Sequence, residues 1–213
     1  MTKKQFDIEV IILAAGLSRR MGEQNKLLMS LDGVPLVRRS VRQYRACSDN
    51  VTVVLGHDAD KVRAALEGLD VTCIENPDYE AGRQSTARFG LQHAALDHDG
   101  LMIGLADQPL LGAIDLSQLM FDFYMDGRDR ISIPYFGDKR GNPVIFPPAV
   151  ARQMRDSNKA PGCRKFIEAN PDLVNRVPVS NHHYTTDMDV PQDAAAYGYL
   201  TGNSLHYRVR SYT

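Results

Sequence analysis

Several features that mark particular classes of protein are scarce in this chain. Its 213 residues contain only three cysteines, Cys47, Cys73 and Cys163, which are odd in number and widely separated. Their spacing suits neither a disulfide framework nor a Cys-x-x-Cys metal motif, so a reducing compartment is expected. The formal net charge is only −1, which gives no global field for nucleic acid or an anionic membrane. Neither is expected as a partner.

Long apolar runs are missing as well. No stretch is long enough to span a bilayer, and the first residues lead into a predicted strand without the apolar core of a signal peptide. We therefore expect a cytoplasmic protein without a membrane partner.

What the chain does contain is an alternation of short apolar runs and amphipathic segments. This order is typical of βαβ units and predicts an α/β fold with a mostly parallel sheet. The runs 131–135 and 144–146 flank the turn-like stretch 137–141 and predict an antiparallel β-hairpin. Since no repeat or linker interrupts the pattern, residues 1–213 are expected to form a single domain. Further strands are predicted at 8–13, 51–55, 71–74, 100–105 and 174–179, and helices at 35–44, 59–66, 85–95, 114–124, 164–168 and after Pro191.

The most informative segment follows the first predicted strand. The sequence Leu-Ala-Ala-Gly at 13–16 ends this strand, and Arg20 and Lys26 come next. Small residues let the backbone approach a ligand closely, while free N–H groups and basic side chains attract phosphate. The spacing fits neither a P-loop nor a G-x-G-x-x-G dinucleotide motif. A strand, a glycine loop and a basic segment are common in α/β proteins, so the segment also fits an ordinary connection.

Carboxylates stand at two later positions. Asp107 comes directly after a buried predicted strand, where a desolvated carboxylate needs a cation or hydrogen-bond donors. Asp187 and Asp189 point to the same side if their segment is extended, so both could face a metal ion, with Asp189 preferred. The alternatives are that Asp107 caps a turn and that the later segment begins a capped helix, with Asp193 in its first turn.

Taken in order, these motifs resemble the molybdenum cofactor nucleotidyltransferases, a branch of the sugar-phosphate nucleotidyltransferase superfamily. The matching pieces are Leu-Ala-Ala-Gly at 13–16, Arg-Met-Gly at 20–22, Lys26, Asp-Gln-Pro at 107–109 and the acidic string at 187–193. The resemblance implies a Rossmann-like, three-layer nucleotidyltransferase fold with a β-hairpin insertion. Its motif-bearing core covers about residues 8–197.

Further loops match the family in part. Asn76 and Ser85 lie in an Asn-Pro…Gly…Ser stretch, where Ser85 would cap a helix, contact the base, or do both. Arg140 and Asn142 lie on the predicted hairpin, where they would contact the second substrate or only form a tight turn. Arg164 offers a fork of donors to phosphate.

The adjacent histidines at 182 and 183 are expected at the surface or at the substrate's edge. Mg²⁺ prefers oxygen ligands, and neighbouring side chains in a strand point in opposite directions.

The resemblance implies that CMP is transferred from CTP to the molybdenum cofactor, with Mg²⁺ as the cofactor and pyrophosphate as the second product. The Leu-Ala-Ala-Gly and Asp-Gln-Pro motifs resemble the cytidylyl rather than the guanylyl branch. A molybdenum hydroxylase is a possible partner as acceptor of the product. The implied site residues are Arg20, Lys26 and Asp107 for catalysis; Leu13, Ala14, Ala15, Gly16, Arg20, Lys26, Asn76 and Ser85 for the nucleotide; Asp107 and Asp189 for the metal; and Arg140, Asn142 and Arg164 for the acceptor.

Two alternatives remain open from the sequence. The first keeps the reaction and changes the acceptor to a sugar phosphate or another small phosphate. The second is a non-catalytic protein that binds or matures the molybdenum cofactor. It is motivated by departures from the family pattern at Ala106, Asn142 and 160–161.

Overall fold

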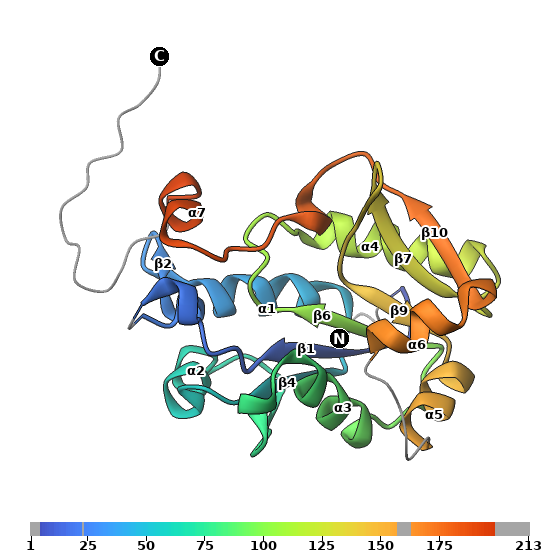
Figure 1. Cartoon of the computed structure of the whole chain (residues 1–213), viewed down its shortest axis with the longest axis horizontal. Coiled ribbons are helices and arrows are strands. Elements are labelled where there is room, and N and C mark those ends of the chain that lie inside the picture. The colour runs from blue at the N-terminus through green and yellow to red at the C-terminus, as the bar shows by residue number, and fades with distance from the viewer. Residues whose placement is uncertain (1–4, 23, 157–162, 199–213) are drawn as a thin grey trace.

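The computed structural model (Figure 1) describes residues 5–22, 24–156 and 163–198. Its main sheet has the strand order β10-β7-β9-β6-β1-β4-β5, and β8 pairs with β7 at the side of this path. The strands are β1 (Ile8–Ala14), β4 (Val51–Leu55), β5 (Thr72–Glu75), β6 (Gly100–Leu105), β7 (Ile131–Phe136), β8 (Lys139–Arg140), β9 (Val144–Phe146) and β10 (Val174–Pro178), while β2 (Ser30–Leu31) and β3 (Val34–Pro35) form a separate pair.

The sheet is mostly parallel, as predicted. Strand β1 pairs in parallel with β4 and β6, and β10 pairs in parallel with β7. Only β9 is reversed within the main path, because it runs antiparallel to β6 and to β7 on its two sides. The carboxyl ends of the parallel strands and the amino end of β9 therefore meet at one edge of the sheet, which is where ligands bind in such folds.

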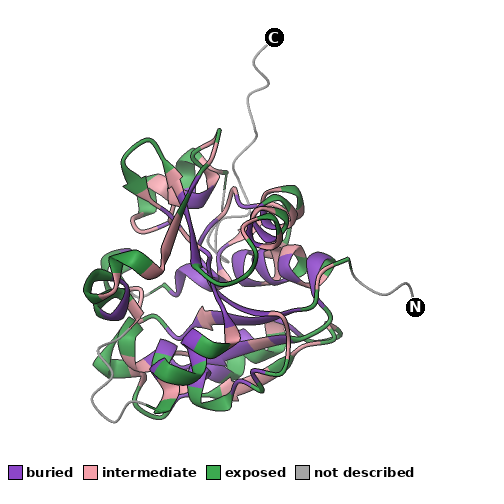
Figure 2. Cartoon of the chain, turned by 90° about the vertical axis from the view of Figure 1, so that its right-hand side faces the viewer, coloured by how far each residue is buried: buried purple, intermediate pink, exposed green. Residues whose placement is uncertain are grey.

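Helices cover both faces of the sheet, because side chains of the central strands alternate between two apolar layers. Ile8, Val10 and Ile12 of β1 belong to one buried cluster, whereas Ile11 belongs to the other. Figure 2 shows the strands as a largely buried layer between the helices. The first cluster includes residues of α1 (Leu36–Cys47), α2 (Ala59–Ala65), α4 (Ala113–Met125) and α7 (Pro191–Ala196), and the second includes residues of α3 (Arg83–His93), α5 (Pro148–Asp156) and α6 (Cys163–Ala169). Among the helices described, none has the length and apolar character to cross a membrane.

The predicted hairpin is partly wrong. Strand β7 turns back on β8, with Tyr135 opposite Arg140 and Phe136 opposite Lys139. Strand β9 is the antiparallel neighbour that we predicted, but it inserts between β6 and β7 and shares only the pair Ser132–Ile145 with β7. A three-residue strand takes its partners from long-range packing, which the local pattern does not report.

Two helices also differ from the sequence prediction. Helix α5 was not predicted, because the paired prolines at 147–148 suggest a loop, although Pro148 occupies the first helical position. Helix α3 begins at Arg83 and is preceded by Gly82. Ser85 therefore lies inside its first turn, and the predicted capping role of Ser85 is wrong.

Candidate active site

The glycine loop that follows β1 opens toward a cavity. A Cβ atom placed on Gly16 would meet no atom within 4 Å, so the backbone here is accessible to a ligand. Beyond it, the Ser18 hydroxyl accepts a hydrogen bond from the Lys26 N–H at 3.2 Å, and the Asn25 side chain accepts one from the Leu27 N–H at 3.0 Å. These bonds fix the short helical turn that begins at Lys26.

Lys26 lies between two carboxylates from distant parts of the chain. Its Nζ is 2.5 Å from Asp107 Oδ2 and 3.0 Å from Asp189 Oδ1. Arg20 contacts the other oxygen of Asp189 at 2.8 Å. The Met188 N–H donates to the Asp107 carbonyl at 2.8 Å, so the two acidic segments are joined by backbone as well. The structure therefore brings together Arg20, Lys26, Asp107 and Asp189, which the family resemblance had assigned to one site.

The charges in this cluster are only partly matched. Burial alone lowers the pKa of Lys26, but Asp107 and Asp189 outweigh it and hold that pKa above its usual value. For Asp189, burial raises the pKa, but Lys26 and Arg20 outweigh it and hold the pKa low. Burial and then the charge of Asp107 raise the pKa of Asp187 to about 6. Asp107 Oδ1 is buried without a hydrogen-bond partner in the described structure.

A cavity of about 230 Å³ contains this cluster and the glycine loop. Its lining includes Leu13, Ala15 and Gly16, whereas Ala14 points into the core on the α1 side. Tyr79 and Arg83 also line it; both lie in the Asn-Pro…Gly…Ser stretch, from which the sequence predicted only Asn76 and Ser85 as site residues. Arg83 directly follows Gly82 in the Asn-Pro loop. A basic residue next to a glycine, in a loop expected near phosphate, is the sequence signal that could have identified it.

Asn76 and Ser85 lie outside the lining of this cavity. The Asn76 amide donates to the Ser85 hydroxyl at 3.2 Å and accepts from the Asp78 N–H at 3.1 Å. The Ser85 hydroxyl donates to the Asp78 carbonyl at 2.9 Å. These bonds hold the loop that carries Tyr79, so any influence on a ligand would pass through the shape of the loop.

A second cavity, of about 850 Å³, adjoins the first, since both are lined by Leu13, Arg83 and Leu105. It contains all three residues predicted for the acceptor, Arg140, Asn142 and Arg164. Residues 160–161, one of the departures from the family pattern, lie outside the described residues. The predicted acceptor residues therefore lie in a cavity beside the one that contains the Lys26 cluster.

The backbone of Tyr184 connects the elements around the site. Its carbonyl accepts hydrogen bonds from the Gln108 side chain at 2.9 Å and from the Asn142 N–H at 2.8 Å. A Cβ atom on Gly141 would lie 2.6 Å from the same oxygen, so only glycine fits there without displacement. This carbonyl therefore links the Asp107 loop, the Arg140 hairpin and the segment that leads to Asp189.

Asp115, at the start of α4, holds the Tyr184 segment in place. Its carboxylate accepts from the Asn181 amide and from the Gly112 N–H, both at 2.9 Å, and lies 2.9 Å from His183 Nδ1. His183 is thus engaged by Asp115, and His182 packs near Phe136 with ring centroids 6.3 Å apart. Neither histidine lines the two cavities.

We expect Asp115→Asn to lower the free energy of unfolding by about 1.5–3 kcal/mol at pH 7, the usual range for hydrogen bonds to a charged group. Burial raises the pKa of Asp115, but Gly112, Asn181 and His183 outweigh it and hold the pKa below its usual value. The carboxylate's stabilisation is therefore complete above the unfolded pKa near 3.9 and is lost as the pH falls through the folded pKa. Urea unfolding of the wild type and of Asp115→Asn, at pH values from 7 to about 2.5, measures the difference between their free energies of unfolding. A difference in the free energy of unfolding that stays constant over that pH range would contradict this role for the carboxylate.

Comparison with known proteins shows the family to which this chain belongs. The model of the MobA-like NTP transferase domain matches residues 10–175 of the chain. The chain belongs to this family. It is a nucleotidyltransferase of the MobA-like group. Arg20, Lys26 and Asp107 lie within the matched range, and Asp189 lies beyond its end.

Individual relatives of this MobA-like chain carry different names. The nicotine blue oxidoreductase of Paenarthrobacter nicotinovorans is 29% identical over 84% of this chain and 90% of its own length. The molybdenum cofactor cytidylyltransferase of Escherichia coli is 24% identical over 87% of this chain and 93% of its own. The bifunctional protein GlmU of Saccharophagus degradans is 35% identical over 53% of this chain. The matched region covers only 25% of the length of that relative.

Solved structures support the fold of the MobA-like domain. A nucleotidyl transferase from Methanothermobacter superposes with a TM-score of 0.74 at 19% identity, covering 90% of this chain and 96% of that one. Rv0371c from Mycobacterium tuberculosis in complex with manganese superposes with a TM-score of 0.67 at 22% identity, covering 90% and 98%. The three-layer nucleotidyltransferase architecture is thus shown.

Proposed function

We propose that this protein transfers CMP from CTP to a molybdopterin-type molybdenum cofactor, releasing pyrophosphate. The observation that carries the proposal is the cluster of Lys26, Asp107 and Asp189 at the glycine loop, with Arg20 beside it. Similarity to the Escherichia coli molybdenum cofactor cytidylyltransferase over most of both chains supports this acceptor and this nucleotide.

The reaction forms a bond between an acceptor phosphate oxygen and the α-phosphorus, and it breaks the bond from that phosphorus to the bridging oxygen of pyrophosphate. The acceptor phosphate is already an anion, so no general base is required. Arg20 and Lys26 would place positive charge on the β- and γ-phosphates and on the leaving pyrophosphate. The exposed backbone at Gly16 would contact the nucleotide, and the adjoining cavities would hold the two reactants for in-line attack.

The acidic residues fit a divalent cation. Asp107 Oδ1 is buried and unpartnered in the described structure, and carboxylate oxygens are the ligands that Mg²⁺ prefers. In the described part of the chain no three acidic, histidine or cysteine side chains converge as a ligand set, and Lys26 occupies the space between Asp107 and Asp189. We propose Asp107 and Asp189 as the ligands, where Mg²⁺ would neutralise charge on the reacting phosphates. The manganese complex of the mycobacterial structure supports a divalent metal.

Pyrophosphate release tests the proposal. Purified protein is supplied with Mg²⁺ and molybdenum cofactor, and CTP and GTP are compared in parallel. Release with CTP alone is expected. Release with GTP instead would keep the mechanism and refute the nucleotide, and release only with another phosphate acceptor would refute the cofactor as substrate.

A second candidate function, a redox reaction, is favoured by the 29% identity to the nicotine blue oxidoreductase. The same assays run with a reduced nicotinamide cofactor and a dye acceptor separate the two. Oxidation of the nicotinamide cofactor without pyrophosphate release would support the redox candidate.

A further inference from the structure

We propose that the end of the larger cavity farthest from Lys26 binds a second anionic group of the acceptor, which Arg140 and Arg176 hold and Tyr135 helps to position. This inference rests on the proposed function, because the acceptor is its second substrate. It defines the acceptor as a molecule with a reacting phosphate at one end and another anionic group at the other.

The two ends of the combined space have different linings. Lys26, Asp107 and Asp189 line only the smaller cavity, whereas Arg140 and Arg176 line only the larger one. Figure 1 shows α7, which follows Asp189, on the left of the view, and α6 and β10 on the right. An acceptor whose phosphate reaches the smaller cavity would therefore extend toward α6 and β10.

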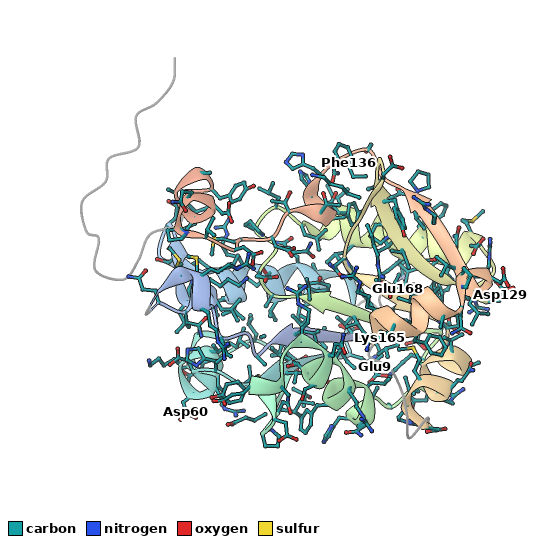
Figure 3. All side chains as sticks on the ribbon, viewed as in Figure 1. Glu9, Asp60, Asp129, Phe136, Lys165 and Glu168 are labelled. Atoms are coloured by element: carbon teal, nitrogen blue, oxygen red, sulfur yellow. The ribbon has the colours of Figure 1, made fainter. Side chains whose placement is uncertain are left out.

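Positive charge dominates the larger cavity. Four arginines line it, and Glu168 is the one carboxylate in its described lining. Glu168, labelled on α6 in Figure 3, contacts Arg164 at 2.9 Å and so is already matched. Arg140 and Arg176 have no carboxylate partner among the described residues. An anionic ligand would supply the missing partner.

The surroundings of Arg140 show that the excess of positive charge in the larger cavity is unfavourable. Its guanidinium is partly buried, and burial, followed by the charge of Arg164 among the lowering causes, brings the pKa of Arg140 below its usual value, although Tyr135, Cys163 and Glu168 raise it. Partial desolvation of a guanidinium is unfavourable, and an anion that pairs with it offsets this cost. Its planar fork of donors matches a phosphate or a carboxylate.

Arg176 is positioned by an aromatic ring. Its guanidinium carbon lies 4.0 Å from the ring centroid of Tyr135, and both side chains line the larger cavity. The two residues come from the neighbouring parallel strands β10 and β7. A guanidinium stacked on a ring keeps its edge donors available, so Tyr135 orients Arg176 without consuming them.

Apolar side chains also line the larger cavity. Ile103, Val144 and Phe146 contribute to the lining and all three are buried. Such side chains suit an apolar part of the acceptor that lies between its two anionic groups.

Steady-state kinetics with molybdenum cofactor as the acceptor test the subsite. Arg176→Ala is expected to raise the KM for the acceptor about 10- to 150-fold, the range of one charge-assisted hydrogen bond. We expect kcat and the KM for CTP to stay within about threefold, since Arg176 lies outside the smaller cavity. Arg176→Lys should give an intermediate KM, and Tyr135→Phe, which keeps the ring, should leave it unchanged. The matched control is Arg42→Ala, an exposed arginine on α1 that lines neither cavity.

Crystals soaked in tungstate, a heavy analogue of phosphate, give a readout that needs no turnover. An anomalous peak between Arg140 and Arg176 is expected in the wild type and in Arg42→Ala, and it should be lost in Arg176→Ala. Absence of this peak in the wild type, or an unchanged acceptor KM in Arg176→Ala, would overturn the subsite. A wild type that shows the peak but releases no pyrophosphate would refute the proposed function and leave the anion subsite standing.

Discussion

Replacing Asp107 with alanine is expected to lower the rate of pyrophosphate release by at least about 100-fold, the scale for removing a preorganised electrostatic group from an active site. The expected cause is loss of the buried oxygens of Asp107, one of which pairs with Lys26 at 2.5 Å while the other has no partner in the described structure. Single-turnover assays at saturating CTP and Mg²⁺ would measure the chemical step directly. Lys26 keeps its contact with Asp189 in this variant, so the fold should survive.

Two comparisons make the Asp107 result interpretable. Asp60→Ala is the matched control, because Asp60 is an exposed carboxylate on α2, labelled at the lower left of Figure 3, and lines neither cavity. Its rate should equal that of the wild type. Near-wild-type turnover in a folded Asp107→Ala protein would remove Asp107 from the proposed metal site.

Replacing Lys26 with alanine should reduce both activity and stability. Lost phosphate contact should cost about 1.5–3 kcal/mol of binding, or roughly 10- to 150-fold in kcat/KM. The larger structural consequence falls on Asp107, which is 7% exposed and loses the only side-chain partner that it has among the described residues. Leaving one member of a buried ion pair uncompensated costs about 3–5 kcal/mol, which corresponds to a Tm lowered by roughly 6–20 °C in a chain of this size.

The effect of Mg²⁺ on the Tm distinguishes the proposed metal site from the structural role of Lys26. If Asp107 and Asp189 bind the cation, Mg²⁺ should raise the Tm of Lys26→Ala more than it raises that of the wild type, because the carboxylates no longer have the ammonium between them. Lys61→Ala serves as the matched control, since Lys61 forms an exposed pair with Asp58 at 2.8 Å. Such a pair contributes about 0–1 kcal/mol. Equal effects of Mg²⁺ on Lys26→Ala and the wild type would argue against metal binding by these aspartates.

The sequence predicted the parts of the fold that local patterns encode. The run at 8–12 is buried on both faces of β1, and the buried face of α1 includes Leu36, Val37, Val41 and Tyr44. Asp193 lies in the first turn of α7, where its carboxylate accepts the Asp189 N–H at 2.8 Å. The segment is therefore a capped helix start, and it also presents Asp189 to Lys26, so the two readings of its sequence are compatible.

The sequence could not supply contacts between distant positions. Asp115 and His183 are separated by 68 residues, and nothing in either local pattern indicates the other. Lys26 and Asp107 are 81 residues apart, and only the family resemblance placed them in one site. Arg176 and Tyr135 meet because β10 pairs with β7, a pairing that depends on the whole sheet. Such contacts follow from topology rather than from propensity.

The position of the Tyr184 carbonyl also matters for anyone who would redesign this enzyme. Every amino acid at position 184 supplies the same backbone oxygen, so an alanine scan there would report on the phenol ring and miss the hydrogen bonds to Gln108 and Asn142. The hydrogen bonds restrict instead which amino acids can occupy the neighbouring positions that approach this oxygen. A combinatorial library aimed at new acceptors should therefore hold Gly141 and Gln108 constant, and place its diversity on the cavity side chains around them.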